Sequence, residues 1–231
     1  AEQGVLAIPR EIVDAKNRNV VVLVSYFGVV AYNKKLISPD KVPNSWEDFL
    51  RPEFKGRKII VDVRPQALPS LIPVMGKEWV LDYARKLAAQ EPVWARGLSR
   101  AISSVTAGEY ALHQMTQYHS CMRAAAKDVT KTLVCKIIEP VPAKIQDGEG
   151  VFQNAAHPNL TLLFIEHAVS PEGQKILDED NPFKSNVLAD GQIAKLLKGK
   201  KVSLNDFRTY SKGAGWMKMI LEAYGFPKAD R

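Results

Sequence analysis

The stretch Val29–Arg57 reads VVAYNKKLISPDKVPNSWEDFLRPEFKGR, and the prediction of the fold starts from it. Its apolar beginning predicts a strand that ends at Tyr32-Asn33, and a polar turn follows. Ser45 and Asp48 have the spacing of a capping box, with aspartate in place of the usual glutamate, which predicts a short helix. The turn Pro-Glu-Phe-Lys-Gly-Arg then leads into a second strand at Lys58–Val63.

Strands and helices alternate along the rest of the chain. The run Val20–Val24 is β-branched and leucine-rich, which predicts a strand buried on both faces, as in a parallel sheet covered by helices. Three further segments carry the apolar period or the end signals of helices: Gly76–Ala89, His157–Val169 and Gly215–Tyr224. The alternation predicts an α/β fold with mostly parallel sheets flanked by helices.

Composition narrows the class of protein. The 231 residues are 46% hydrophobic and 25% charged, which suits one large globular domain or two small lobes. The formal net charge is +7, but the cations are scattered except at Lys195–Lys201. Without an arginine-rich arm or an aromatic-basic stripe, we expect no nucleic-acid partner. The charge fits either an ordinary solvated surface or a mild attraction for anionic solutes.

The first residues of the chain and its two cysteines give information about the cellular compartment of the protein. Ala1-Glu2-Gln3 has neither the charged start nor the apolar core of a signal peptide, so we expect any export signal to have been removed. Cys121 and Cys135 form no CxxC pair and are too few for a zinc site. In an oxidising periplasm they could form a disulfide, and the alternative is two separate buried thiols.

Several short patterns occur in the order found in one known family. They are Tyr32-Asn33, Pro43–Leu50, Pro52–Gly56, Ala107–Glu109, Pro140–Pro142, Gly148–Gly150, His157–Asn159 and Ser170–Gln174. Each is weak alone, but together they cover the chain from Tyr32 to about Leu177. In this the chain resembles bacterial extracellular solute-binding proteins of the iron(III)/thiamine/polyamine-like group.

The resemblance implies a two-lobed periplasmic-binding-protein fold of type II. It implies a periplasmic protein that captures a small anionic solute or a ferric complex in the cleft between its lobes. The partner would be an ABC permease in the inner membrane, and ferric iron would be a transported ligand rather than a cofactor. Two alternatives remain open on the same fold: a ligand-sensing regulatory domain, and an enzyme such as a transferase.

The family's topology also predicts how the lobes divide. Lobe one would hold residues 1–35 and 141–188, and lobe two residues 36–140 and 189–231. Relatives carry further strand–helix units before the part that resembles Ala1–Tyr32, and those units supply half of the first lobe and part of the ligand site. Their absence here leads us to expect either a fragment or a shortened first lobe.

Tyr118-His119 is a candidate ligand site implied by the resemblance. The iron(III)-binding members carry a tyrosine pair at the corresponding place, and a phenolate oxygen is a hard anionic donor. This chain keeps the first tyrosine, so Tyr118 is a candidate metal ligand, but it has His119 in place of the second. The alternative is that Tyr118 lines the cleft as an aromatic wall and His119 caps a helix or packs.

A second group of candidates follows the strand Lys58–Val63. Asp62, Arg64, Gln66 and Ser70 lie at or beyond its end, where open α/β sheets bind their ligands. Arg64 could hold a carboxylate or phosphate through two hydrogen bonds, or it could be an ordinary surface arginine. We expect these residues to share one cleft with Tyr118 and His119.

The sequence contains no GxSxG, HExxH, P-loop or GxGxxG pattern. We therefore predict a binding protein rather than an enzyme.

Overall fold

The computed structural model describes residues 7–180, 182–188 and 191–226. Its strands are β1 (Val21–Asn33), β2 (Ile59–Asp62), β3 (Val93–Ala95), β4 (Leu112–Gln117), β5 (Leu133–Lys136), β6 (Val141–Glu149) and β7 (Val202–Asn205). Its α-helices are α1 (Ile72–Met75), α2 (Lys77–Ala89), α3 (Leu98–Thr106), α4 (Tyr118–Lys127), α5 (Pro158–Val169), α6 (Pro171–Asp180), α7 (Gln192–Leu197) and α8 (Gly213–Ala223). Short 3₁₀ turns occur at Arg10–Ile12, Glu47–Leu50, Pro52–Phe54, Leu68–Leu71 and Tyr210–Lys212.

The chain divides into two compact units. Unit 1 consists of Ala1–Tyr26 and Ile145–Gly199, and unit 2 of Phe27–Lys144 and Lys200–Arg231. The chain therefore passes between the units within β1, within β6 and after Gly199. The lobe boundaries expected from the sequence lie at residues 35, 140 and 188, and that division remains a prediction.

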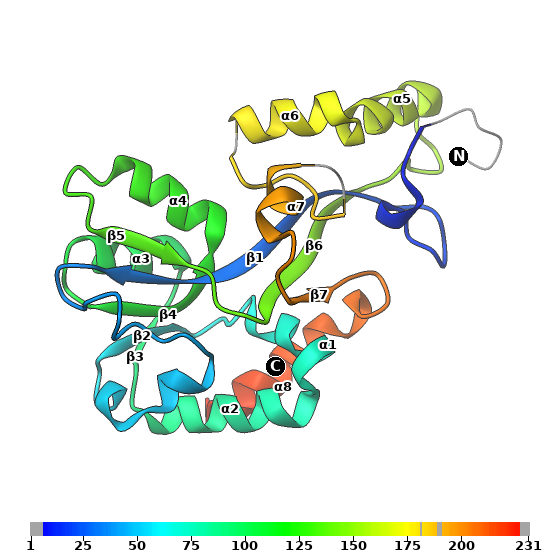
Figure 1. Cartoon of the computed structure of the whole chain (residues 1–231). Coiled ribbons are helices and arrows are strands. Elements are labelled where there is room, and N and C mark those ends of the chain that lie inside the picture. The colour runs from blue at the N-terminus through cyan, green and yellow to red at the C-terminus, as the bar shows by residue number, and fades with distance from the viewer. Residues whose placement is uncertain (1–6, 181, 189–190, 227–231) are drawn as a thin grey trace. The chain divides into compact units, whose positions relative to one another are not determined.

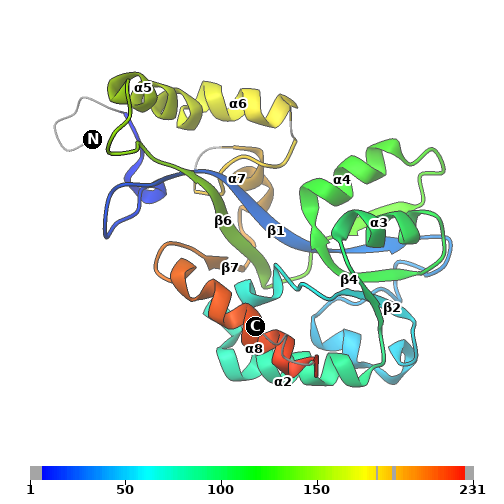
Figure 2. The same ribbon diagram turned by 180° about the vertical axis from the view of Figure 1, so that it is seen from behind.

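The sheet of the described residues has the order β3-β2-β4-β1-β6-β7, and β5 also pairs with β1 (Figures 1 and 2). β2 runs parallel to β3 and to β4, and β6 runs parallel to β7. β1, however, is antiparallel to both β4 and β5. The α/β class predicted from the sequence is confirmed. The prediction that the run Val20–Val24 belongs to a parallel pair is wrong, because its bridges to Val13 and Ser185 are antiparallel as well.

β1 is nevertheless buried on both faces, as its composition predicts. Of its 13 residues, all but Leu23 are buried. The strand direction of β1 was predicted wrongly for a physical reason. Burial on two faces requires cover on both sides of a sheet, and an antiparallel strand inside a mixed sheet meets that condition as well as a parallel one.

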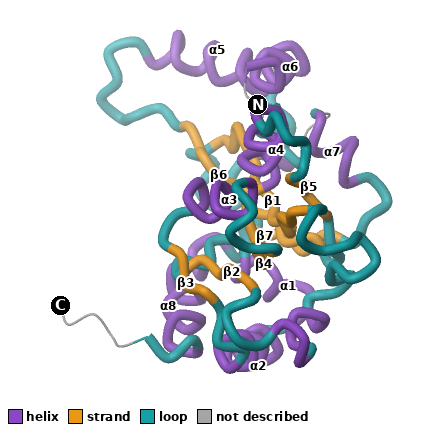
Figure 3. Tube along the Cα trace, turned by 90° about the vertical axis from the view of Figure 1, so that its left-hand side faces the viewer, coloured by secondary structure: helices purple, strands orange, loops and turns teal. Residues whose placement is uncertain are grey.

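In unit 2 the helices cover the two faces of the sheet. α2 and α8 pack side by side on one face, while α3 and α4 lie on the other (Figures 1 and 3). The α2–α8 face encloses an apolar core that includes Trp46, Phe49, Ile59, Val80 and Ile220. The indole Nε1 of Trp46 donates a hydrogen bond to the carbonyl oxygen of Pro140 at 3.0 Å, so the largest buried side chain also has its polar atom satisfied.

The capping box predicted at Ser45 is present. The Asp48 N–H donates to Ser45 Oγ at 3.2 Å, and the Ser45 N–H donates to Asp48 Oδ2 at 3.1 Å. The helix it precedes is a single 3₁₀ turn, Glu47–Leu50. Nearby in the fold, the Pro140–Pro142 segment leads into β6, with Val141 as its first residue and Pro142 opposite Ser203 of β7.

Buried amides hold unit 1 together. Gln174 Nε2 donates to the carbonyl oxygens of Leu23 and Ala168, and its Oε1 accepts from the Asn186 N–H at 2.7 Å. Asn186 Nδ2 in turn donates to the carbonyl oxygen of Val22 at 2.7 Å. These bonds attach α6 and the loop after it to the first residues of β1, which satisfies polar groups that burial would otherwise penalise.

Helix α5 in unit 1 is apolar on more than one side. Ile165 and Val169 are buried in the unit 1 core. Leu160, Leu163 and Phe164 instead remain exposed, at 64%, 57% and 61% of their accessible surface. None of the helices in the described part of the chain combines the length and the apolar composition that crossing a bilayer requires.

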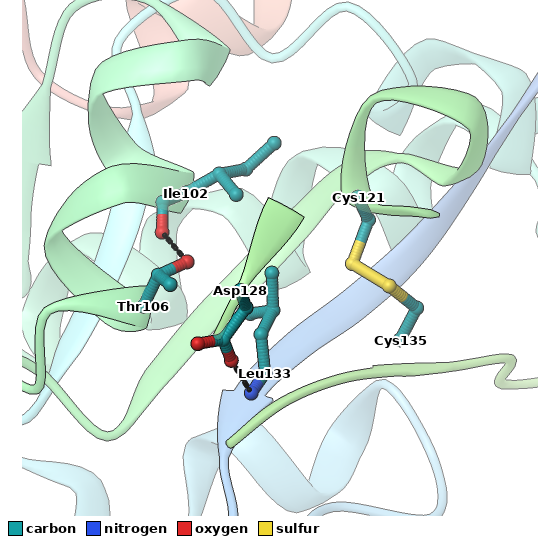
Figure 4. Close-up of a disulfide and its surroundings, with 6 residues drawn as sticks. All are labelled: Ile102, Thr106, Cys121, Asp128, Leu133 and Cys135. Carbon is teal, nitrogen blue, oxygen red and sulfur yellow. Dashed lines mark hydrogen bonds between the residues drawn. A yellow bond between two sulfur atoms is a disulfide. The ribbon is translucent and has the colours of Figure 1, made fainter. Parts of the chain in front are cut away.

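Cys121 and Cys135 form a disulfide, which settles the alternative left open by the sequence (Figure 4). Their Cα atoms are 6.0 Å apart, so the bond connects α4 to β5 without displacing either element. The loop between them is anchored by Asp128, whose carboxylate accepts hydrogen bonds from the N–H groups of Thr130, Thr132 and Leu133. Together with the Thr130 hydroxyl, these donors hold the pKa of Asp128 well below its usual range.

Removal of the disulfide should destabilise the fold. A cross-link across 14 residues of chain restricts the unfolded ensemble, so Cys121→Ser/Cys135→Ser should lower the free energy of unfolding by about 3 kcal/mol. Urea denaturation of the oxidised wild type and the double variant measures this difference. The wild type under reducing conditions should match the variant, and equal midpoints for oxidised and reduced wild type would contradict the prediction.

His113 is fully buried in the middle of β4. Neither ring nitrogen finds a hydrogen-bond partner within the described part of the chain. Burial lowers the pKa of His113 from 6.5 to about 4, because the apolar surroundings disfavour the imidazolium. The folded state therefore requires a neutral histidine.

A neutral buried histidine makes stability depend on pH. Its contribution is fully present above the unfolded pKa of about 6.5 and is lost as the pH falls toward the folded value, with a total cost on the order of 3 kcal/mol. His113→Leu should remove this component, so the stability difference between variant and wild type should grow in favour of the variant from pH 7 to pH 4. Urea titrations across that range test it, and parallel curves for the two proteins would disprove it.

Candidate functional site

A pocket lies where β2 and β4 of unit 2 end. These strands are parallel, so their carboxyl ends meet at one edge of the sheet, which is where open α/β sheets bind ligands. In this structure the pocket is a narrow recess with a cavity volume of about 10 Å³, roughly the room that one water molecule needs. Its lining consists of Val61, Asp62, Arg64, Pro65, Gln66, Ala67, Leu98, Gln114, Met115, Thr116 and Gln117.

Asp62 supports the turn that forms one wall. Its Oδ1 accepts a hydrogen bond from the Arg64 N–H at 2.8 Å, and the side chain is buried. Burial raises the pKa of Asp62, although the hydrogen bonds from the backbone of Arg64 and Gly97 oppose that shift. Asp62 therefore holds the turn that carries Arg64.

Arg64 supplies the pocket with a positive charge. Its side chain is exposed, and it forms no ion pair with any residue of the described chain. The Gln66 N–H donates to the Arg64 carbonyl oxygen at 2.7 Å, which tightens the turn and brings the half-buried Gln66 to the same pocket. The charge of Arg64 acts on the nearby Asp62 carboxylate and opposes the rise of its pKa, but no carboxylate holds the guanidinium in a direct ion pair, so it can still bind an anion through two hydrogen bonds.

The opposite wall comes from polar residues of β4 that the sequence analysis did not select. Gln114 is buried and donates through Nε2 to the hydroxyl oxygen of Tyr83 at 3.1 Å. The Thr116 hydroxyl is buried without a hydrogen-bond partner among the described residues. The signal was present in the sequence LHQMTQ, since polar residues at the end of an otherwise buried strand are unusual unless they have a partner.

Tyr118 and His119 follow this wall but do not line the pocket. Tyr118 is the first residue of α4 and is 8% exposed, with its ring stacked on Phe27 at a centroid distance of 4.6 Å. Burial raises the pKa of the Tyr118 phenol. His119 Nε2 shares a hydrogen bond with Ser120 Oγ at 3.1 Å.

The sequence-predicted site residues fall into two groups, those that line the pocket and those that do not. Tyr118, His119 and Ser70 are outside its lining. Asp62, Arg64 and Gln66 share the pocket. Ser70 is buried in a 3₁₀ turn, and its hydroxyl has no partner in the described chain. No three His, Cys, Asp or Glu side chains gather as a metal site anywhere in the described ranges.

Gly28 allows β1 to pack closely behind the pocket. A Cβ added there would lie 2.9 Å from Pro142 Cγ, 3.1 Å from Ala67 Cβ and 3.2 Å from Met115 Cγ. Ala67 and Met115 also line the pocket, so they cannot retreat without changing its shape. The glycine at position 28 of this apolar strand is therefore explained by the close packing around it.

Gly28→Ala should consequently both destabilise unit 2 and disturb the pocket. Overpacking of this kind costs roughly 1–3 kcal/mol in free energy of unfolding. Gly215→Ala is a matched control, because a Cβ at that position of α8 meets nothing within 4 Å. Thermal and urea unfolding of both variants measure the effect, and equal stability of the two would show that the contacts behind Gly28 relax freely.

Comparison with known proteins identifies the class. Residues 5–212 match the family model described as bacterial extracellular solute-binding protein, so the chain belongs to that family. This confirms the resemblance seen in the sequence motifs. The members are binding proteins, and the function of the chain is solute binding for transport. No curated protein sequence matches it.

Solved structures with the same two-lobed fold are similar to this chain at low sequence identity. Iron-bound HitA from Pseudomonas aeruginosa has 16% identity and a TM-score of 0.71, over 94% of this chain and 72% of that one. The ferric binding protein from Campylobacter jejuni has 22% identity and a TM-score of 0.69, over 94% and 72%. Trichodesmium FutA, in complex with iron and citrate, has 22% identity and a TM-score of 0.72, over 94% and 73%.

Proposed function

We propose that the pocket at the ends of β2 and β4 binds a small anionic solute, or a ferric complex of one. The protein would collect this solute in the periplasm and deliver it to an ABC permease in the inner membrane. The observation that supports this most directly is the pocket itself. It combines the exposed guanidinium of Arg64 with several amide side chains and the partnerless hydroxyl of Thr116.

Each of these groups has a role in holding an anion. Arg64 would form a charge-assisted pair with a carboxylate or phosphate. The amides of Gln66 and Gln117 can donate to or accept from the polar groups of the same solute, and the Thr116 hydroxyl would gain the partner that it lacks. An apolar floor of Val61 and Met115 excludes water and strengthens these interactions.

Ferric iron enters the proposal through Tyr118. The three structural relatives named above are described as ferric-binding or iron-bound proteins, and phenolate oxygen suits a hard cation. Because burial raises the pKa of Tyr118, its phenolate would form only when a cation replaces the proton. Iron would then be carried as a transported ligand, with its accompanying anion held by Arg64.

Transport of this kind needs no chemical turnover by the protein. Ligand would shift the population toward a bound conformation, and the permease would recognise that conformation. We therefore infer a binding protein without enzymatic activity.

The first test separates the anion from the metal. Arg64→Ala should weaken binding of citrate and of ferric citrate about tenfold or more, because the pocket loses its cation. Tyr118→Phe keeps the ring but removes the oxygen, so it should weaken ferric citrate while leaving citrate within about twofold of the wild type. Isothermal titration calorimetry with both ligands measures the affinities.

Arg85→Ala provides the matched control, since Arg85 is an exposed arginine of α2 outside the pocket. It should bind like the wild type. Equal binding of citrate by the Arg64 and Arg85 variants would remove the anion site from this pocket. If Tyr118→Phe binds ferric citrate as the wild type does, Tyr118 is not an iron ligand. That result would not contradict the proposed anion site at Arg64.

A further inference from the structure

A second pocket opens at the other end of the same parallel strands. Lys58 directly precedes β2 and Leu112 begins β4, so this pocket lies at the amino ends of the strands whose carboxyl ends form the first one. Its cavity volume is about 670 Å³, and it is open to solvent. Its lining is Leu36, Ile37, Lys41, Glu53, Phe54, Arg57, Lys58, Glu109, Tyr110, Ala111 and Leu112.

The floor of this pocket is apolar and rigid. Leu112 and Phe54 are buried in the core of unit 2. Leu36 remains 51% exposed, although a large aliphatic side chain on a loop gains by being covered. The turn that carries Leu36 is fixed, because the N–H groups of Leu36 and Ile37 both donate to the carbonyl oxygen of Asn33.

Arg51 holds in place the wall of the pocket that contains Lys41, Glu53 and Phe54. Its Nη2 donates to the carbonyl oxygen of Lys41 at 3.1 Å and pairs with Glu53 Oε1 at 3.1 Å. Its guanidinium also lies over the Phe54 ring, 5.2 Å from the centroid. These contacts place Lys41 and Phe54 on one preformed wall, and they commit the Glu53 carboxylate to a partner.

The remaining charges favour an anion. Lys41, Arg57 and Lys58 line the pocket, and none of them forms an ion pair within the described chain. Glu109 is the lining carboxylate left without a partner there, so the cations outnumber the uncommitted acids. Such an excess over an apolar floor gives a positive potential, although the neighbouring Asp40 carboxylate interacts with the charge of Lys41.

The backbone at Arg57 adds a second indication. Its φ is +63°, in the left-handed region that glycine or asparagine adopts at lower cost. The conformation is held by the Arg57 N–H, which donates to the carbonyl oxygen of Glu91 at 2.8 Å. A long cationic side chain at such a position contributes nothing to the turn, so its charge is the feature to explain.

We propose that this pocket is a second ligand site, for a small organic anion with an apolar body. The anionic group lies among Lys41, Arg57 and Lys58, and the apolar body covers Leu36, Phe54 and Leu112. The first pocket, with its guanidinium and amides, suits a polar anion instead. The two sites therefore differ in ligand chemistry as well as in position.

Anilinonaphthalene sulfonate is the probe for this site, and N-phenylnaphthylamine is its neutral counterpart. We expect one-site binding of the sulfonate to full-length protein, with amide chemical shift changes in NMR centred on residues 36–37, 57–58 and 109–112. Arg57→Gly/Lys58→Ala should weaken it about tenfold, and the neutral probe should bind the wild type about tenfold more weakly. Glycine suits the backbone at position 57, so the fold should tolerate the change.

Two matched variants complete the experiment. Lys55→Ala removes a neighbouring cation that pairs with Glu91 outside the pocket, and it should change sulfonate binding less than about twofold. Arg64→Ala should also change sulfonate binding less than about twofold. The proposal for this second pocket can therefore be tested independently of the proposed function of the first. Shift changes confined to the exposed face of α5, or equal affinities for the double variant and Lys55→Ala, would overturn the proposal.

Discussion

The burial of β1 on both faces is the constraint on which the rest of the structure depends. This strand pairs with β4 and β5, lies next to β6, and contributes residues to both units. A strand of 13 residues with a single half-buried position must be covered over its whole length. The close approach at Gly28 and the amide bonds to Leu23 and Val22 all serve that cover.

Much of this architecture is readable from the sequence because burial and end signals act locally. Ser45 and Asp48 form the predicted reciprocal bonds, and Ser170 Oγ accepts from the Gly173 N–H just before α6. Strand direction is different, since the same apolar run suits either a parallel or an antiparallel pair. The face of α5 that packs is equally undetermined, because a helix with apolar residues on several sides gives no unique stripe.

The candidate site shows where sequence reasoning stops. Asp62, Arg64 and Gln66 could be found because they follow one strand, and the rule about carboxyl strand ends is local. The wall from β4 depends on which strand lies beside β2, and that pairing joins residues about 50 positions apart in the chain, such as Ile60 and His113. The burial of Tyr118 against Phe27 has the same origin, since only the tertiary fold brings β1 and α4 together.

The disulfide also bears on ligand capture. Tyr118 begins α4, and Cys121 lies one helical turn further on, where it is bonded to a strand that is itself paired with β1. The start of this helix is therefore anchored covalently before any ligand arrives. At the proposed site, less conformational entropy would have to be surrendered when a solute binds beside this helix, so affinity would depend on the oxidation state of two sulfur atoms that never touch the solute.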